Sequence, residues 1–188
     1  MQLEQFSMGV GDRFGMQGAA QLRAFARARD EGVAVSPVWN KSHREHEICG
    51  TTPDDVRREA DEAVAQAGWK HPYAVDADHI NLSNVDGFIA ASDFFTIDVA
   101  EYIGEEPDCD DLDEFVEANS DCIGSLKIPD VERDFSVTAK LLTDIGGRYL
   151  RPIREAGAIY RHIAARAGST PPAIEVSMDE AEEPQTPV

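Results

Sequence analysis

The chain has 188 residues, of which 42% are hydrophobic, and this size and composition are typical of one globular domain with a substantial core. Its formal net charge of −19, from 36 acidic and 17 basic residues, disfavours nucleic acid and anionic membranes as partners because such a surface repels them. The sequence has no apolar run of ~18 residues and no signal-peptide pattern at its start. Its three cysteines lack CxxC spacing, which predicts free thiols and a cytoplasmic protein.

Strands and helices alternate along the chain up to about residue 99. Apolar residues recur every three or four positions in the helical segments, which stop at Gly32 and Gly68, and Pro53 suits a first helical position. The expected elements are a strand over 6–14, a helix over 17–30, a strand over 33–38, a helix over 53–67, a strand over 73–82, a short helix over 84–91 and a strand over 94–99. This order predicts an α/β fold with parallel strands, either a barrel or a doubly wound sheet.

The second half of the chain differs in composition. The segment 104–131 is rich in acids and has little to bury, so we expect an exposed insertion with a short helix. Residues 135–167 have a helical pattern that Gly146, Gly147 and Pro152 should divide into two or three helices. The expected organisation is a single α/β domain over 1–188, an acidic insertion over 104–131, a last strand over 173–180 and a tail over 181–188.

Acidic and imidazole side chains follow the apolar part of the strand expected over 73–82. Asp76, Asp78 and His79 stand at its C-terminal end, the edge at which parallel α/β folds bind ligands. Carboxylates beside an imidazole suit a metal-assisted acid/base site. The alternative is a surface turn whose acids cap the next helix.

The glycine-rich segment GVGDRFG follows the first strand. Its glycines miss the spacing of a dinucleotide-binding loop by one residue, and no lysine-serine or lysine-threonine pair follows, so a nucleotide site is disfavoured. The glycines instead allow a sharp turn that exposes Asp12 and Arg13, which we predict to bind substrate. Arg13 could hold a substrate carboxylate in a bidentate pair, and the alternative is a structural salt bridge.

Further substrate-binding residues are expected beyond the second strand, in PVWNKSHREH. In a chain with four lysines, Asn40, Lys41 and Arg44 belong to a local positive island that could attract an anionic sugar acid. The alternative is an ordinary polar loop. Asp98 lies in an apolar strand, where an unpaired charge is unfavourable, so we expect it to meet a cation, a metal or a hydrogen-bond donor, and we include it in the substrate site.

The last predicted strand repeats the frame of the Asp78 segment. VSMDE, residues 176–180, and VDADH, residues 75–79, both run apolar, polar, small or apolar, Asp, and then a group that can bind metal or transfer a proton. If both are barrel strands, His79 and Glu180 leave the sheet at comparable heights and face one another across the mouth. Opposed acid/base groups beside a metal-bound carbonyl sugar are what a two-base epimerisation requires.

Six segments in this order, FSMGVGDRFGMQG, PVWNKSHREH, VDADHINL, SDFFTIDVAEYIG, EAGAIYRHI and EVSMDEAEEPQTP, resemble the tagaturonate/fructuronate epimerases of bacterial hexuronate catabolism. The resemblance implies a TIM-barrel-like isomerase with a divalent metal cation that interconverts D-fructuronate and D-tagaturonate, inverting C4 of a keto-hexuronate. It also implies that Asp78 is the proton acceptor and His79 a metal ligand. The proton donor corresponds to an acid of EVSMDE, Glu180 by its strand-end position, with Glu175 as the alternative.

Members of that family are much longer, and the resemblance places further histidine ligands in the second half of their barrel. A barrel needs eight strands, whereas about five are expected here, which leaves parallel edge strands uncovered. We therefore expect a partial TIM-barrel-like fold, the N-terminal portion of such an enzyme, with a partner chain as one source of the rest. The alternatives are an inactive remnant or split-barrel subunit that requires a partner, and a related keto-sugar isomerase or aldolase.

Overall fold

The computed structural model describes residues 3–168 and 170–179. Its helices and strands are β1 (Phe6–Gly11), α1 (Gly18–Asp30), β2 (Val35–Ser42), α2 (His43–Cys49), α3 (Pro53–Ala67), β3 (Ala74–Ile80), β4 (Phe94–Asp98), α4 (Cys109–Ala118), β5 (Gly124–Leu126), β6 (Phe135–Val137), α5 (Ala139–Arg166) and β7 (Ala173–Ser177). They form two compact units. The first unit holds β1 to β4, the end of α5 from Ile159 onward, and β7, and the second unit holds Val99–Ala158.

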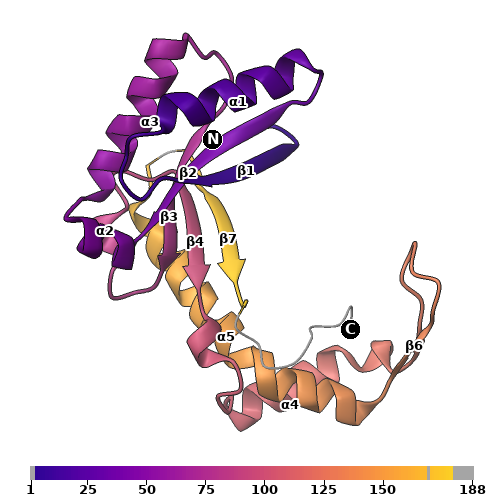
Figure 1. The fold of residues 1–188 in the computed structure, drawn as a ribbon. Coiled ribbons are helices and arrows are strands. Elements are labelled where there is room, and N and C mark those ends of the chain that lie inside the picture. The colour runs from indigo at the N-terminus through magenta and orange to yellow at the C-terminus, as the bar shows by residue number, and fades with distance from the viewer. Residues whose placement is uncertain (1–2, 169, 180–188) are drawn as a thin grey trace. The chain divides into compact units, whose positions relative to one another are not determined.

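The first unit is built on a five-stranded sheet with the order β1-β2-β3-β4-β7, in which every neighbouring pair is parallel (Figure 1). The spatial order follows the chain order with no reversal. A doubly wound sheet has such a reversal, whereas the strands of a (β/α) barrel follow one another in sequence. The prediction of a partial barrel-like α/β fold is therefore confirmed, and the order decides between the two topologies that the sequence had left open.

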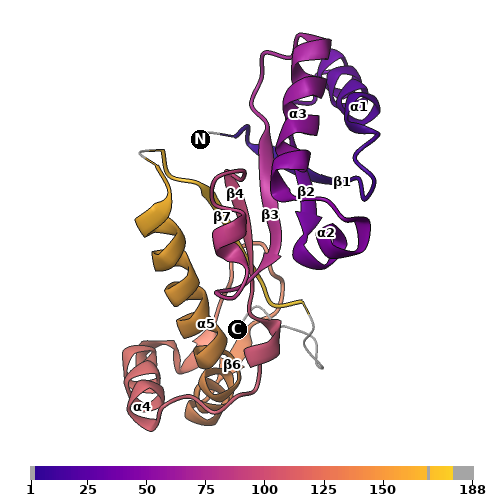
Figure 2. The same cartoon turned by 90° about the vertical axis from the view of Figure 1, so that its left-hand side faces the viewer.

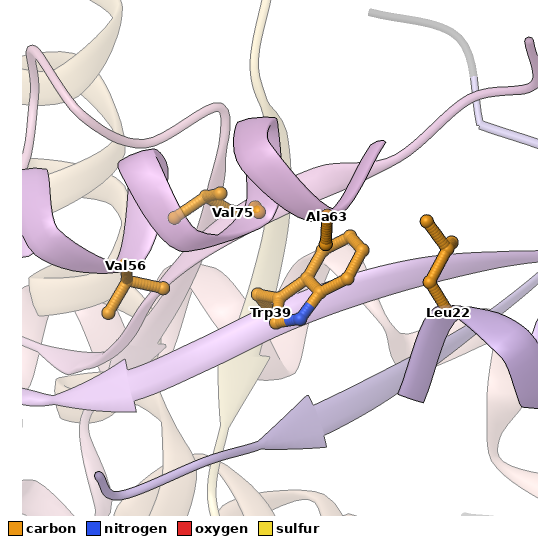
Figure 3. Close-up of a cluster of buried hydrophobic side chains, with 6 residues drawn as sticks. Leu22, Trp39, Val56, Ala63 and Val75 are labelled. Atoms are coloured by element: carbon orange, nitrogen blue, oxygen red, sulfur yellow. The ribbon is translucent and has the colours of Figure 1, made fainter. Parts of the chain in front are cut away.

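The two faces of this sheet differ in chemistry. Trp39 of β2 pairs with Val75 of β3, and both pack with Leu22 of α1 and with Val56 and Ala63 of α3 in a buried apolar cluster (Figure 3). Helices α1 and α3 lie side by side over this part of the sheet (Figures 1 and 2). We call this the helix face. Because side chains alternate along a strand, the residues next to Trp39 and Val75 point to the opposite face, which we call the inner face.

The loop after β2 contains a short helix that we did not predict. Ser42 caps α2, since its hydroxyl accepts from the amide of Glu45 while the Glu45 carboxylate accepts from the amide of Ser42. This is a capping box, and its S-x-x-E pattern was present in PVWNKSHREH. Helix α2 ends at Gly50, which has φ 62°, a conformation that glycine adopts without strain.

Two predicted helices differ from the structure. The segment expected to be helical over 84–91 contains only the 3-10 turn η1 (Val85–Gly87). The helical region near the C-terminus is the single helix α5, with Pro152 inside it, so the predicted division into two or three helices is wrong. Proline cannot donate to the carbonyl four residues earlier. That carbonyl, on Arg148, instead accepts from the amide of Gly104 at 2.9 Å.

The second unit contains α4, the first part of α5 and a short antiparallel hairpin, β5–β6, that we did not predict. Its residues include the acidic insertion expected over 104–131. In the part of the chain that the structure describes, no helix is both long and apolar enough to cross a membrane. Cys49, Cys109 and Cys122 are free thiols.

Adjacent glycines in α5 provide a test of packing in the second unit. A Cβ on Gly146 would lie 2.6 Å from Leu112 Cδ1 and 2.9 Å from Phe115 Cδ1, whereas a Cβ on Gly147 would meet nothing within 4 Å. We expect Gly146→Ala to lower the free energy of unfolding by ~1–2 kcal/mol, because overpacking outweighs the gain in helix propensity. Gly147→Ala should raise it by ~0.5–1 kcal/mol. Urea denaturation of both variants checks this, and equal changes would contradict the packing of α4 on α5.

Candidate active site

The inner face of the sheet carries a group of carboxylates. Asn40 pairs with Asp76 along β2 and β3, and Thr96 pairs with Glu175 along β4 and β7. Asp76 and Thr96 are in hydrogen-bond contact, so all four residues share the inner face. Asp78 follows two residues after Asp76 and lies on the same face. Asp76 is 6% exposed, and the Asp78 side chain is 17% exposed, so two acids that stand close together are largely withdrawn from water.

A β-bulge at the end of β3 directs His79. Ala77 pairs with Phe95 and Ile80 with Ile97, so the two residues Asp78 and His79 oppose the single residue Thr96. His79 has φ 51°, a conformation that is strained for a residue with a Cβ. Bulges of this kind re-aim side chains and are common beside active sites.

The re-aimed imidazole lies between two carboxylates. His79 Nδ1 is 3.0 Å from Asp98 Oδ2, and His79 Nε2 is 3.9 Å from Asp78 Oδ1. Asp98 therefore meets a hydrogen-bond partner, as the sequence predicted for an acid in an apolar strand. Its partner is the histidine itself, so Asp98 fixes the orientation of the His79 ring.

Asp76 is the most buried acid of the site. Its Oδ1 accepts from the Thr96 amide at 3.1 Å, and its Oδ2 accepts from the Thr96 hydroxyl at 2.9 Å. Burial raises the pKa of Asp76 to about 7, and the nearby charges of Asp78 and Glu175 act in the same direction while the bonds from Thr96 oppose them. Asp76 can therefore hold or release a proton near neutral pH.

Burial also raises the pKa of Asp78. The positive charge of protonated His79 and a hydrogen bond from the Asn40 amide group oppose this shift, and the charges of Glu45 and Glu175 add to it. Asn40 lies against β1, where a Cβ on Gly11 would be 3.6 Å from Asn40 Oδ1. That oxygen is buried and has no hydrogen-bond partner among the described residues. The sequence had placed Asn40 in the substrate site, and the structure brings it together with Asp78.

The residues predicted in the glycine-rich segment are engaged with other groups of the protein. The Asp12 carboxylate accepts from the amides of Phe14, Met16 and Gln17 in its own loop. Burial opposes its ionisation, but these bonds outweigh that effect and lower the pKa of Asp12. Arg13 forms an exposed ion pair with Glu45, Nε to Oε1 at 3.1 Å. This is the structural salt bridge that was the alternative to substrate binding.

The expected positive island does not assemble beside the carboxylates. Lys41 is 2% exposed, follows Trp39 by two positions on the helix face, and donates to the backbone oxygen of Arg13 at 2.6 Å. Arg44 lies exposed on α2. Lys41, Thr51 and Glu59 line a hollow of about 370 Å³, and no inner-face acid lines it. Among the described residues, the C-terminal edge of the inner face therefore gathers acids, and Lys41 does not lie among them.

A second carboxyl pair ties the first loop to α3. Burial raises the pKa of Glu59 to about 6, and hydrogen bonding to Asp12 adds to the shift. Glu59 Oε1 also accepts from the Gly18 amide at 2.9 Å. Because the folded pKa lies above the unfolded value near 4.3, this group contributes stability at low pH that is lost as pH rises through about 6.

We therefore expect Glu59→Gln to raise the free energy of unfolding at pH 7.5 by about 1 kcal/mol and to have little effect at pH 4. Glutamine keeps the acceptor for Gly18 and a donor toward Asp12 without a titrating proton. Urea denaturation at both pH values measures the difference, with the exposed Glu62→Gln as the control, expected to stay within about 0.5 kcal/mol. An effect of equal size at both pH values would contradict a raised pKa of Glu59 in the folded chain.

Comparison with known proteins decides the family. A family model described as tagaturonate epimerase matches residues 1–188, the whole chain. The chain belongs to the tagaturonate epimerase family. The tagaturonate/fructuronate epimerase of Thermotoga maritima is 34% identical to the chain over 100 residues, which make up 52% of this chain and 20% of that protein. The resemblance drawn from the sequence motifs is confirmed.

Solved structures of the family share the fold described above. The fructuronate-tagaturonate epimerase UxaE from Cohnella laeviribosi superposes with a TM-score of 0.76 in its complex with one glycerol and 0.71 in its native form, at 22% identity in both cases. Each match covers 97% of this chain and 39% of the solved chain. The 188 residues thus correspond to well under half of the length of a solved tagaturonate epimerase.

The metal site that the family resemblance implies is not complete in the described residues. His79 has a carboxylate on Nδ1, which is the usual arrangement of a metal-bound histidine. Within residues 3–168 and 170–179, however, no three His, Cys, Asp or Glu side chains are placed to hold one metal ion. These residues do not by themselves fit a divalent cation, so we derive no chemical step through one. Glu180, the predicted proton donor, lies outside the described residues.

Asp76 was predicted as part of the acid/base cluster but without a role of its own, and Thr96 was not predicted. Both stand on the inner face, and the signal for Asp76 was present, since it precedes Asp78 by two residues on one strand. Thr96 likewise precedes Asp98 by two residues on β4. Their mutual contact depends on the pairing of β3 with β4, which no local pattern indicated.

Proposed function

We propose that this chain forms the N-terminal part of an epimerase that interconverts D-fructuronate and D-tagaturonate by inverting C4 of the keto-hexuronate. Family membership over the whole chain supports this proposal. The observation that carries it is the cluster of acidic side chains on the inner face of a parallel sheet. This cluster lies at the strand edge where barrel enzymes have their active sites.

In this proposal Asp78 is the proton acceptor. It projects from a bulge, it is mostly withdrawn from water, and Asn40 supports it by a hydrogen bond. A base that takes a proton on one side of the substrate needs an acid that returns one on the other. We assign the acid to Glu180 and keep Glu175, which lies on the inner face of β7 opposite Thr96, as the alternative.

We further propose that His79 supplies one ligand to a divalent cation and that the rest of the family's barrel supplies the others. The His79–Asp98 pair and the negative charge of Asp78 suit a cation at this edge. Asn40 is proposed to bind substrate through Oδ1, the buried acceptor without a described partner.

The charge of the site also supports a contribution from outside these residues. A keto-hexuronate is an anion, and the described inner face presents acids while Arg13, Lys41 and Arg44 are engaged or exposed elsewhere. Cations for the substrate carboxylate are therefore proposed to come from the remainder of the barrel, in a continuation of this chain or in a partner chain.

The test is product formation by an assembled enzyme. The 188-residue chain is co-expressed with the part of the Cohnella laeviribosi epimerase that it does not cover, and the purified mixture is incubated with D-fructuronate and divalent cation. Chromatography then measures D-tagaturonate. The positive control is the Cohnella laeviribosi enzyme divided at the same point, which must regain activity on co-expression for the test to count.

We expect D-tagaturonate from the co-expressed pair, loss of product on chelation of the cation, and little conversion of D-fructose. Preferential conversion of D-fructose would favour a related keto-sugar isomerase instead. A co-purified, folded complex that gives no product, beside an active control, would identify the chain as an inactive remnant and overturn the proposal.

A further inference from the structure

The bulge that carries Asp78 and His79 has one residue opposite it. Thr96 stands alone on β4 across from these two residues, because the pairs Ala77–Phe95 and Ile80–Ile97 flank them. At this point the backbone ladder between β3 and β4 is irregular. The direction of the His79 side chain therefore depends on how Thr96 is held.

Asp76 holds Thr96 by two contacts from the strand that bulges. Its carboxylate accepts from both the amide and the hydroxyl of Thr96, at 3.1 and 2.9 Å, and these contacts are buried. The contact starts two residues before Asp78, and it ends on the residue that faces the bulge. It thus joins the two sides of the irregular stretch directly.

We propose that Asp76 is a positioning residue for the active site: its two-point bond to Thr96 fixes the β3 bulge and so sets the direction of Asp78 and His79. The strain of His79, with φ 51°, is consistent with a backbone that its surroundings hold in place. The importance of this positioning of Asp78 and His79 for catalysis rests on the proposed function. The positioning itself is measurable without any enzymatic activity.

A second carboxylate, on the residue immediately before β4, offers a matched control. Asp93 Oδ1 accepts from the Val75 amide at 2.8 Å, and its Oδ2 lies 2.9 Å from Arg57 Nη2. Asp93 therefore makes the same kind of contact, from a carboxylate to an amide of the neighbouring strand, at the other end of β3. Its loss should destabilise the sheet without disturbing the bulge.

The experiment uses imidazole ¹H–¹⁵N correlation spectra of the 188-residue chain at one fixed pH below 7, where parent Asp76 is uncharged like asparagine. His79→Gln assigns the His79 signals, and His162, whose Nε2 is 2.6 Å from Asp86 Oδ1, is the internal reference. The variants are Asp76→Ala, Asp76→Asn, Thr96→Val and Asp93→Ala. Asparagine at position 76 keeps an acceptor for the Thr96 amide and a donor toward its hydroxyl, so it should preserve the contact.

We expect Asp76→Ala to shift or broaden the His79 signals, Thr96→Val to shift them less, and Asp76→Asn to leave them unchanged. Asp76→Ala and Asp93→Ala should both lower Tm by roughly 5 °C, with the His79 signals unmoved in Asp93→Ala and the His162 signals unmoved in all variants. If Asp76→Ala unfolds, Thr96→Val decides. The proposal would be overturned by unmoved His79 signals in the deciding variant, or by a shift in Asp76→Asn as large as that in Asp76→Ala. An assembled enzyme that is inactive while these shifts are present would count only against the epimerase assignment.

Discussion

Replacing Asp78 by asparagine is expected to lower kcat of the assembled epimerase by ~10²–10⁴-fold, the range that a general base contributes, with KM changed little. Asparagine has the shape of aspartate and still accepts from the Asn40 amide group, so the bulge and the substrate site should persist. Only the group that takes the proton is removed. Steady-state kinetics of D-fructuronate conversion, followed as D-tagaturonate formed, give kcat and KM separately.

The control for this prediction is Asp93→Asn. Asp93 lies on the loop side of β4, bonds to Val75 and Arg57, and is not among the inner-face acids. Its replacement should lower stability while kcat stays within about threefold of the parent. If Asp78→Asn retains kcat to the same extent, Asp78 is not the base, and Asp76 and Glu175 become the acids to examine.

The fold was predictable wherever local patterns determine it. Apolar runs with stop signals such as Gly68 located most strands and helices, and the resemblance to the family indicated a barrel. The failures arose from contacts distant in sequence. Pro152 does not end α5 because the amide of Gly104, 48 positions before it, bonds to the carbonyl that proline leaves without a partner.

The site, too, was predictable where local sequence patterns determine it and not where contacts distant in sequence do. Asp78, His79 and Asn40 were predicted from strand-end positions and Asp98 from its place in an apolar strand, and the structure brings these four together. Lys41 was grouped with Asn40 because it is adjacent in sequence, yet adjacent residues on a strand point to opposite faces. Which residues of β2 face the helices depends on the packing of Trp39 against α1 and α3, and the sequence of β2 alone does not reveal that packing.

The second large effect is expected at Asp76 and concerns stability. The folded pKa of Asp76 is raised to about 7, whereas an unfolded aspartate titrates near 3.9. Between these values the folded chain keeps a proton that the unfolded chain has lost, so stability is present below about pH 4 and falls as pH rises to about 7. At ~1.4 kcal/mol for each pH unit, the loss above pH 7 reaches at most about 4 kcal/mol.

Asp76→Asn removes this titration and preserves the bonds to Thr96, so the variant should be more stable than the parent by up to ~4 kcal/mol at pH 8 and nearly equal to it at pH 4. Urea denaturation of both chains between pH 4 and 8.5 measures the difference. Ser36→Ala is the control, because it removes a buried hydroxyl that accepts from the Glu4 amide without changing any titrating group, and its effect should not vary with pH. Parallel curves for parent and Asp76→Asn would mean that Asp76 is ionised in the folded state throughout. Curves that converge toward pH 4 would show instead that the folded chain keeps Asp76 protonated beside Asp78 at pH values where an unfolded aspartate has lost its proton.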